Sequence, residues 1–202
     1  RKVIMKYFIG IVIGCSITAL ILIPLFSKKL SSRIVDRSVM EVIHTGAIVK
    51  STIDKRSGNL TKKLSAVAEI IAADRDLSMK LIVENDRSAP EISDIASLYI
   101  EPMNLSILEI TDSNYVILSS GHFPASIGNS VAEKGSILTD SALCLSDNIK
   151  GKDTLTLQAK ITFTIADQTM YCIGGYIIDE PFIEDIRPRQ GVSLLLKYDG
   201  EI

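Results

Sequence analysis

The chain has 202 residues, a formal net charge of -2 at pH 7, 47% hydrophobic residues and no tryptophan. This length is enough for one domain with a substantial core beside an apolar segment. The charge balance gives no support for a basic surface of the kind that binds nucleic acid, so no nucleic-acid partner is expected.

An uncharged apolar segment lies near the start of the chain. Residues 7–27, YFIGIVIGCSITALILIPLFS, are bounded by Lys6 and by the pair Lys28 and Lys29. About 20 apolar residues are what an α-helix needs to cross a bilayer core, and Pro24 is tolerated near the end of such a helix. We expect a retained transmembrane helix, with a cleaved signal peptide and a buried core helix as alternatives. Basic residues flank both ends, so charge does not settle the orientation.

Helices are expected from there to about residue 100. Apolar residues recur at three- and four-residue steps and predict a long helix that continues the membrane segment: Leu30, Ile34, Val39, Val42, Ile43, Val49 and Ile53. We expect Gly58 to end that helix, and a second apolar stripe to follow: Leu60, Leu64, Val67 and Ile71. Asp76 and Pro90 are expected at the starts of two short helices. Residues 28–100 are thus interpreted as a helical stalk and cap that follows a flank at 1–6 and the membrane segment.

The pattern changes to β-structure after Leu105. Residues 106–111 predict a strand, 112–114 a tight turn and 115–120 the returning strand. A polar loop is expected to follow, to about residue 153, with a short strand or helix around 138–145.

Two long strands and a short helix are expected next. Residues 154–165 and 169–178 are rich in β-branched and aromatic side chains and predict strands. The pair Gly174-Gly175 inside the second strand indicates a bulge or a close backbone approach. A short helix is predicted at 182–186. Finally, residues 193–197 predict a strand that leads to a hairpin turn, so we interpret 191–202 as the truncated start of a second, similar unit.

This order of elements resembles the extracytoplasmic Cache (PAS-like) sensor domains of bacterial receptors. The segments that carry the resemblance are ILEITDSNYVILSSGHFPASIGN at 107–129, CIGGYIIDEPFIEDI at 172–186 and SLLLKYDGEI at 193–202. The chain departs from the usual pattern at Asn114, where the family has Gly, and because Asn tolerates positive φ the turn is expected to survive. The resemblance implies an α+β fold, in which an N-terminal transmembrane helix continues into a long helix and a PAS-like antiparallel sheet lobe follows at 101–190.

The resemblance also implies a function. It implies the extracytoplasmic ligand-sensing region of a transmembrane receptor, above all a two-component sensor histidine kinase, in the bacterial inner membrane. A homodimer and a small-molecule ligand of the amino acid, carboxylate or amine class are the expected partners. The alternatives are a chemoreceptor or cyclase ectodomain, a membrane-anchored structural or interaction subunit without a small ligand, and an anchored enzyme whose active residues lie beyond Ile202.

Candidate site residues follow from strand alternation and from the expected hairpin. Alternation places Tyr171 and Asp179 on one face of their strand, where the pair could hold an amine or amino acid. The remaining candidates lie near the first hairpin or on the neighbouring long strand: Tyr115, Ser119, His122 and Thr162. The competing interpretation is that the tyrosines pack on the sheet, that Asp179 caps the following helix and that the histidine lies at the edge of the core.

The sequence contains no convincing catalytic set, and no cofactor or metal is expected. A G-x-S-x-G motif, a phosphate-binding loop and a C-x-x-C or Cys/His cluster are all missing. Outside the membrane segment, Cys144 and Cys172 could form a disulfide in an extracytoplasmic domain, or they could be two small buried hydrophobic residues.

Overall fold

The computed structural model describes residues 39–81, 89–165 and 167–187. The chain divides into two compact units, Arg1–Ile48 and Val49–Ile202. Within the described ranges, none of the helices combines the length and the apolar character needed to cross a membrane. The expected flank at 1–6, transmembrane helix at 7–27 and second lobe at 191–202 lie outside the described residues.

The described part of the first unit, residues 39–48, is helical. Its apolar side chains are exposed, with Val39 at 51%, Val42 at 71% and Ile43 at 60% of their full accessible surface. Among the residues that the structure describes in this unit, nothing covers the apolar stripe that the sequence shows in this segment.

The second unit begins with a helix at residues 49–73, which we call the long helix. The expected end at Gly58 was wrong, because residues 57–59 are helical. Four fully or almost fully buried residues continue one face of the helix past that point: Leu60, Leu64, Val67 and Ile71. Burying them outweighs the cost of about 1 kcal/mol that a glycine imposes on a helix interior.

Short helices complete the helical part. They are α2 (Arg75–Met79), α3 (Pro90–Ser93) and α4 (Ile95–Ile100). Asp74 caps α2, in place of the expected Asp76, by accepting hydrogen bonds from the backbone N–H groups of Asp76 at 2.9 Å and Leu77 at 3.2 Å. Pro90 opens α3 as predicted, where its missing N–H costs no hydrogen bond.

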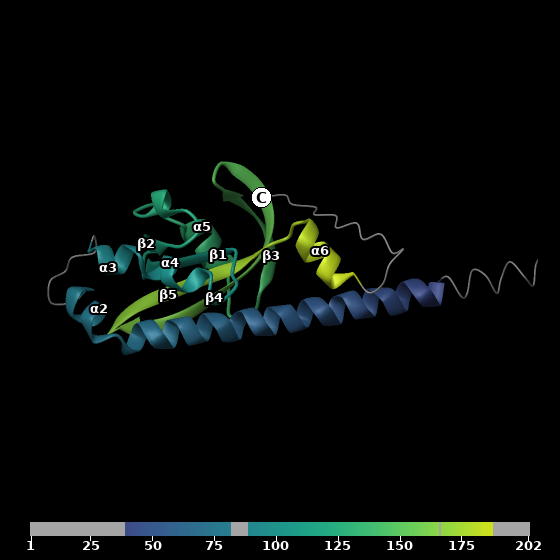
Figure 1. Ribbon diagram of the computed structural model, residues 1–202, viewed down its shortest axis with the longest axis horizontal. Helices are drawn as coiled ribbons and strands as arrows, with labels where there is room; N and C mark the ends of the chain where they lie inside the picture. The colour runs from purple at the N-terminus through teal and green to yellow at the C-terminus, as the bar shows by residue number, and fades with distance from the viewer. Residues whose placement is uncertain (1–38, 82–88, 166, 188–202) are drawn as a thin grey trace, which may run out of the picture. The chain divides into compact units, whose positions relative to one another are not determined.

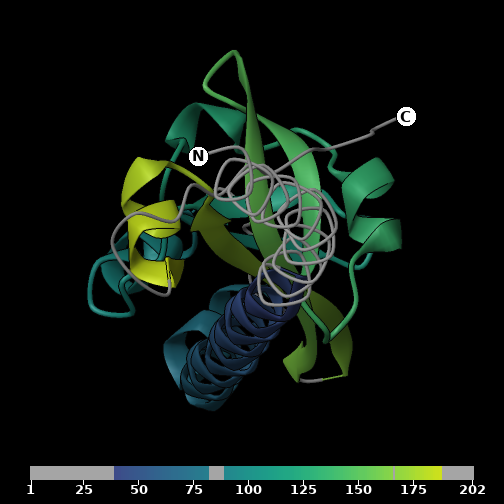
Figure 2. The same cartoon turned by 90° about the vertical axis from the view of Figure 1, so that its right-hand side faces the viewer.

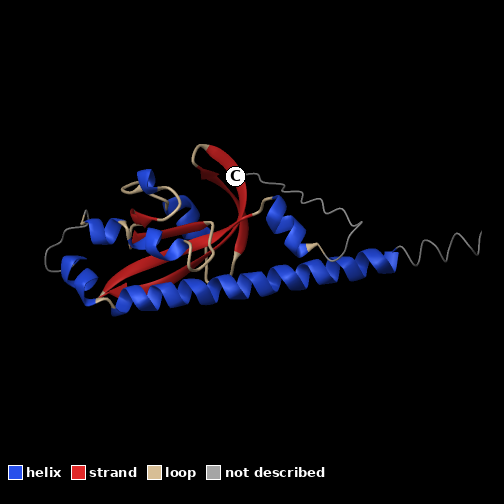
Figure 3. Ribbon diagram, in the orientation of Figure 1, coloured by secondary structure: helices blue, strands red, loops and turns tan. Residues whose placement is uncertain are grey.

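Five antiparallel strands form one sheet in the described part of the chain (Figures 1 and 3). They are β1 (Ile107–Asp112), β2 (Ile117–Ser120), β3 (Leu143–Ile149), β4 (Lys152–Ile165) and β5 (Gln168–Ile177). The order across the sheet is β2-β1-β5-β4-β3, with β5 at the centre. The α+β class and the antiparallel sheet after a long helix are thus confirmed.

The two hairpins show where local signals were read correctly and where they were missed. In the β1–β2 turn, Asp112 Oδ1 accepts from the N–H groups of Asn114 and Val116, each at 2.9 Å. The positive φ of this turn falls on Tyr115, at 60°, and not on Asn114 as expected. The β3–β4 turn was not predicted: Lys150 and Gly151 have φ of 54° and 83°, the mark of a type I′ hairpin.

The segment between β2 and β3 holds two short helices, η2 (Pro124–Ser126) and α5 (Ala132–Ile137). The short element expected around 138–145 is in fact the edge strand β3, which begins at Leu143. After β5 the chain forms α6 (Glu180–Ile186), close to the predicted helix at 182–186.

The long helix packs on one face of the sheet. Buried side chains of that face include Leu108, Ile110, Ala159 and Cys172, in one cluster with the apolar face of the helix. A Cβ added at Gly174 would lie 2.5 Å from Leu64 Cδ2. Because β5 keeps an unbroken register with both neighbours, the glycine pair marks a close approach and no bulge.

Figure 2 shows the ribbon of α6 in yellow. A second apolar cluster joins this helix to the long helix. Phe182 and Ile186 are buried together with Leu157 of β4, and Val49 and Ile53 pack against them. Arg56 of the long helix lies 4.5 Å from the Phe182 ring centre, a cation–π contact.

Candidate ligand-binding site

The sheet face opposite the long helix carries polar side chains. Glu109 in β1, Lys160 in β4 and Tyr171 in β5 alternate with the residues that face the helix, so they point to the other side. In the register, Glu109 is opposite Ile173, and Ile173 is opposite Lys160. The segment that contains α5 lies over this face, because Lys134 of α5 contacts Glu109 of the sheet.

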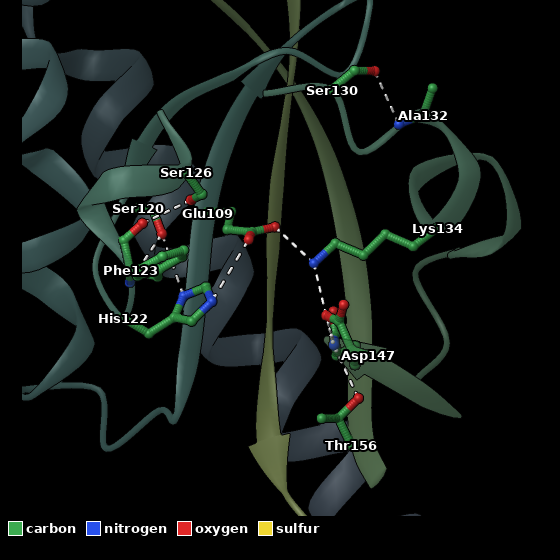
Figure 4. Close-up of polar contacts among 11 residues, drawn as sticks. Glu109, Ser120, His122, Phe123, Ser126, Ser130, Ala132, Lys134, Asp147 and Thr156 are labelled. Carbon is green, nitrogen blue, oxygen red and sulfur yellow. Dashed lines mark hydrogen bonds and ion pairs between the residues drawn. The ribbon is translucent and has the colours of Figure 1, made fainter. Parts of the chain in front are cut away.

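A buried network of charges and amides lies under α5 (Figure 4). Lys134 Nζ is 3.0 Å from Glu109 Oε2 and 2.8 Å from Asp147 Oδ2. Gln158 Nε2 donates to Asp147 Oδ2 at 2.7 Å and to Thr156 Oγ1 at 2.9 Å. The Glu109 side chain is 4% exposed, and those of Lys134 and Asp147 are 14% exposed. We call these five residues, together with His122, the polar cluster.

The ion pairs keep Lys134 and Asp147 charged. Burial alone would lower the pKa of Lys134, but Glu109 and Asp147 outweigh it and the pKa is raised. Burial alone would raise the pKa of Asp147, but the Lys134 ammonium and the Gln158 amide hold it below its ordinary value. The raised pKa of Lys134 means that this residue contributes stability below about pH 10. The lowered pKa of Asp147 means that this residue contributes stability above about pH 4, so both contributions are present at neutral pH.

His122 lies at the end of the polar cluster nearest to β2, between Glu109 and Ser120. Its Nε2 lies 3.7 Å from Glu109 Oε1, and its Nδ1 lies 3.4 Å from Ser120 Oγ. Burial lowers the pKa of His122; the charge of Lys134 acts in the same direction, and Glu109 and Asp147 act against it. The imidazole is therefore neutral at neutral pH.

A groove of about 650 Å³ opens beside the cluster, between the α5 segment and β3. Lys134 and Asp147 belong to its lining, so the polar cluster forms part of its wall. The full lining is Ser130, Val131, Glu133, Lys134, Ile137, Leu143, Cys144, Leu145, Ser146, Asp147, Asn148 and Asp153. An apolar lining with a few well-placed polar groups is typical of sites for small molecules.

Three of the residues predicted from the sequence come together near Gly135 of α5, but none of them lines the groove. The rings of Tyr115 and Tyr171 stack, with centres 4.6 Å apart and planes 12° apart, and Thr162 is the strand partner of Tyr171. Lys160 Nζ lies 5.0 Å from both ring centres and donates to Tyr115 Oη at 3.0 Å, which lowers the pKa of Tyr115. A Cβ at Gly135 would lie 2.3 Å from the Tyr115 ring, so α5 rests directly on this stack.

The other predicted residues have structural contacts. Ser119 is buried on the α4 side, where its Oγ donates to Ser93 O at 2.7 Å and accepts from Ala96 N at 2.9 Å. Asp179 caps α6 by accepting from Phe182 N at 3.0 Å. His122 lies in the polar cluster. For all six residues, a role in contacting a ligand stays a prediction.

Most of the polar cluster was not found from the sequence. Glu109 left a signal, because it is the one charged residue within the apolar run ILEIT. A carboxylate at such a position is buried and needs a partner. Lys134 and Asp147 lie in stretches where charged residues are common, so nothing local sets them apart.

Neither Cys144 nor Cys172 forms a disulfide. Cys172 is a buried free thiol whose pKa burial raises to about 12, as the small-hydrophobe interpretation requires, whereas Cys144 is exposed on the groove wall. Within the described ranges, His, Cys, Asp and Glu side chains form no group of three or more that could hold a metal ion.

No family model matches the chain, and no curated protein matches it. Several solved structures are similar to the chain. The Escherichia coli DcuS sensor domain is 16% identical, with a TM-score of 0.46, over 66% of this chain and 98% of that domain. The Vibrio cholerae LuxQ periplasmic domain is 15% identical, with a TM-score of 0.48, over 72% and 68%.

The sensor domain of the Vibrio cholerae histidine kinase DctB is 12% identical, with a TM-score of 0.48, over 77% of this chain and 59% of that domain. The three solved structures are described as a sensor domain, a periplasmic domain and the sensor domain of a histidine kinase.

Proposed function

We propose that this chain is the extracytoplasmic ligand-sensing region of a bacterial transmembrane receptor, and that the receptor is a sensor histidine kinase. One observation carries the proposal: an open groove of about 650 Å³ whose wall includes Lys134 and Asp147 of a buried ion-pair network, on the sheet face opposite the long helix. A network of this kind costs free energy of desolvation, and stability alone does not require it.

The arrangement supports a route from ligand to helix. A ligand in the groove would contact α5 and β3, and Lys134 ties α5 to both β1 and β3. The opposite face of β1 and β5 packs on the long helix, with Gly174 against Leu64. A ligand that prefers one position of α5 would shift a two-state equilibrium of the sheet and helix. Displacements of about 1–2 Å are known for helices at such interfaces.

The membrane part of the proposal rests on the sequence. Residues 7–27 would form the anchor, with the soluble part outside the cytoplasm. The exposed apolar side chains Val39, Val42 and Ile43 would pack against a second copy of the chain and form the expected homodimer. Val42→Asp would then uncouple ligand binding from output without weakening binding.

A ligand screen tests the proposal. The full chain in detergent micelles would be heated with amino acids, carboxylates and amines, and the unfolding midpoint followed by intrinsic fluorescence. A ligand that binds only the native state raises the midpoint. The shift should shrink in Asp147→Asn and persist in the matched control Asp76→Asn on α2. A midpoint unchanged by every class of compound would refute a small-ligand sensor.

A further inference from the structure

We infer that the groove between α5 and β3 takes an organic cation, an amine with a small apolar body, whose ammonium group binds Asp147 in competition with Lys134. This inference rests on the proposed function and names its ligand class. The sequence left amino acids, carboxylates and amines open, and the charges of the site separate them.

The polar cluster carries one uncompensated negative charge. Two carboxylates, Glu109 and Asp147, share the single ammonium of Lys134, and His122 is neutral. Buried charges are costly unless they are paired. Binding of one more cation beside Asp147 would give each carboxylate its own ammonium and bring the formal charge of the cluster to zero.

The groove wall has the same bias. Glu133, Asp147 and Asp153 line it, and among the described residues of the lining Lys134 is the one basic side chain. Lys134 is already held by two carboxylates at 3.0 and 2.8 Å. A carboxylate ligand would therefore meet three acidic groups and no free cation, and Coulomb repulsion would weaken its binding.

A second observation is a buried acceptor on the residue that holds Asp147, although this residue does not itself line the groove. Gln158 is fully buried and its Nε2 donates to Asp147, while its Oε1 accepts no hydrogen bond from the described residues. A buried acceptor without a donor lowers the stability of the folded state. An ammonium beside Asp147 brings three N–H donors to this neighbourhood.

The rest of the lining fits the body of such a ligand. Val131, Ile137, Leu143 and Leu145 supply apolar surface, and the exposed fractions of Ile137 and Leu143 are 61% and 37%. Covering this surface would add hydrophobic free energy to the charge pairing. An amine with an alkyl or aromatic group of a few carbons matches both parts of the wall.

The experiment compares matched probes that differ in charge. The full chain would be titrated with butylammonium, butane-1,4-diammonium and phenethylammonium. The corresponding alcohols and carboxylates would serve as comparison compounds. We expect the amines to raise the unfolding midpoint by a few degrees and the matched alcohols and carboxylates to leave it unchanged. Asp147→Asn should weaken amine binding about tenfold or more, and Asp76→Asn should leave it intact.

A second variant tests the competition. In Lys134→Ala the vacated space and the two unpaired carboxylates should bind butylammonium more tightly than the wild type, and the amine should restore part of the lost stability. If this variant does not fold, the comparison of the wild type with Asp147→Asn still decides the matter.

The outcomes separate this inference from the proposed function. Stabilisation by a carboxylate or an alcohol and not by amines, lost in a groove variant such as Leu145→Asp, would overturn the amine class and leave the sensor intact. Amine stabilisation equal in the wild type and Asp147→Asn would mean non-specific binding and would also overturn it. No stabilisation by these probes or by any compound of the wider screen would refute both.

Discussion

Replacing Lys134 with methionine tests whether the polar cluster is a true buried ion-pair network. The unbranched methionine side chain keeps much of the apolar stem of lysine and removes only the ammonium. Glu109, with a side chain 4% exposed, would then lie near Asp147, 14% exposed, with no cation between them. The Gln158 amide would still donate to Asp147.

The size of the effect follows from burial. Removing one partner of a buried ion pair costs about 3–5 kcal/mol, whereas a surface pair contributes about 0–1 kcal/mol. Because Asp147 borders an open groove and keeps one hydrogen bond, we expect a loss near the lower value, about 3 kcal/mol. With a urea m-value of about 2 kcal/mol/M, the unfolding midpoint would fall by roughly 1.5 M.

Equilibrium urea unfolding of the full chain, followed by circular dichroism, measures this change. Lys62→Met, at an exposed position of the long helix, is the matched control and should stay within about 0.5 kcal/mol of the wild type. The triple variant Glu109→Gln/Lys134→Met/Asp147→Asn should recover most of the loss, since no charge is left unpaired. A loss below about 1 kcal/mol for Lys134→Met would refute the buried network, because only a solvent-screened pair behaves in that way.

Three further predictions concern the sheet, the histidine and the last helix. Gly174→Ala should destabilise the chain by about 1–3 kcal/mol in urea, because its Cβ would lie 2.5 Å from Leu64 Cδ2. Leu64→Ala should therefore cost less stability in the Gly174→Ala variant than in the wild type. His122, whose pKa burial lowers, contributes stability above about pH 6.5 that is lost as the pH falls, so His122→Gln should flatten the thermal midpoint between pH 7 and pH 5. Asp179→Ala should cost about 1 kcal/mol through the lost α6 cap and leave ligand-induced thermal shifts unchanged; a lost shift would restore Asp179 as a ligand contact.

Elements with strong local signals were predicted correctly. The strand-forming residues on both sides of the turn and the Asp112 side chain in the turn fix the β1–β2 hairpin. β4 and β5 follow the predicted strands to within two residues. Pro90 opens a short helix by its own geometry. In these places the chemistry of a few neighbouring residues decides the structure, so one sequence is sufficient.

Elements decided by distant contacts were not predicted. The helix passes through Gly58 because Leu60 and Leu64 gain free energy of burial on the sheet, a contact that local glycine propensity does not contain. The polar cluster depends on the strand register and on where α5 rests. Glu109, Lys134 and Asp147 lie in separate elements, and only the fold brings the two carboxylates within 3.0 Å of the Lys134 ammonium.

A single layer of β-strands separates the polar cluster beside the groove from the long helix. Glu109, which holds Lys134, is directly followed by Ile110 and preceded by Leu108, and both of these pack in the core with the helix. Gly174 is opposite Leu108 in the register and lies on the same helix-facing side of the sheet, close to Leu64. Packed interiors resist small continuous deformation, so a movement of Glu109 must either break the β1–β5 ladder or move its helix-facing neighbours. In the proposed sensor the helix would therefore respond to α5 through β1 and β5. A substitution at Gly174 should then change the coupling between ligand and output more than the ligand affinity, whereas a substitution at Asp147 should change the affinity first.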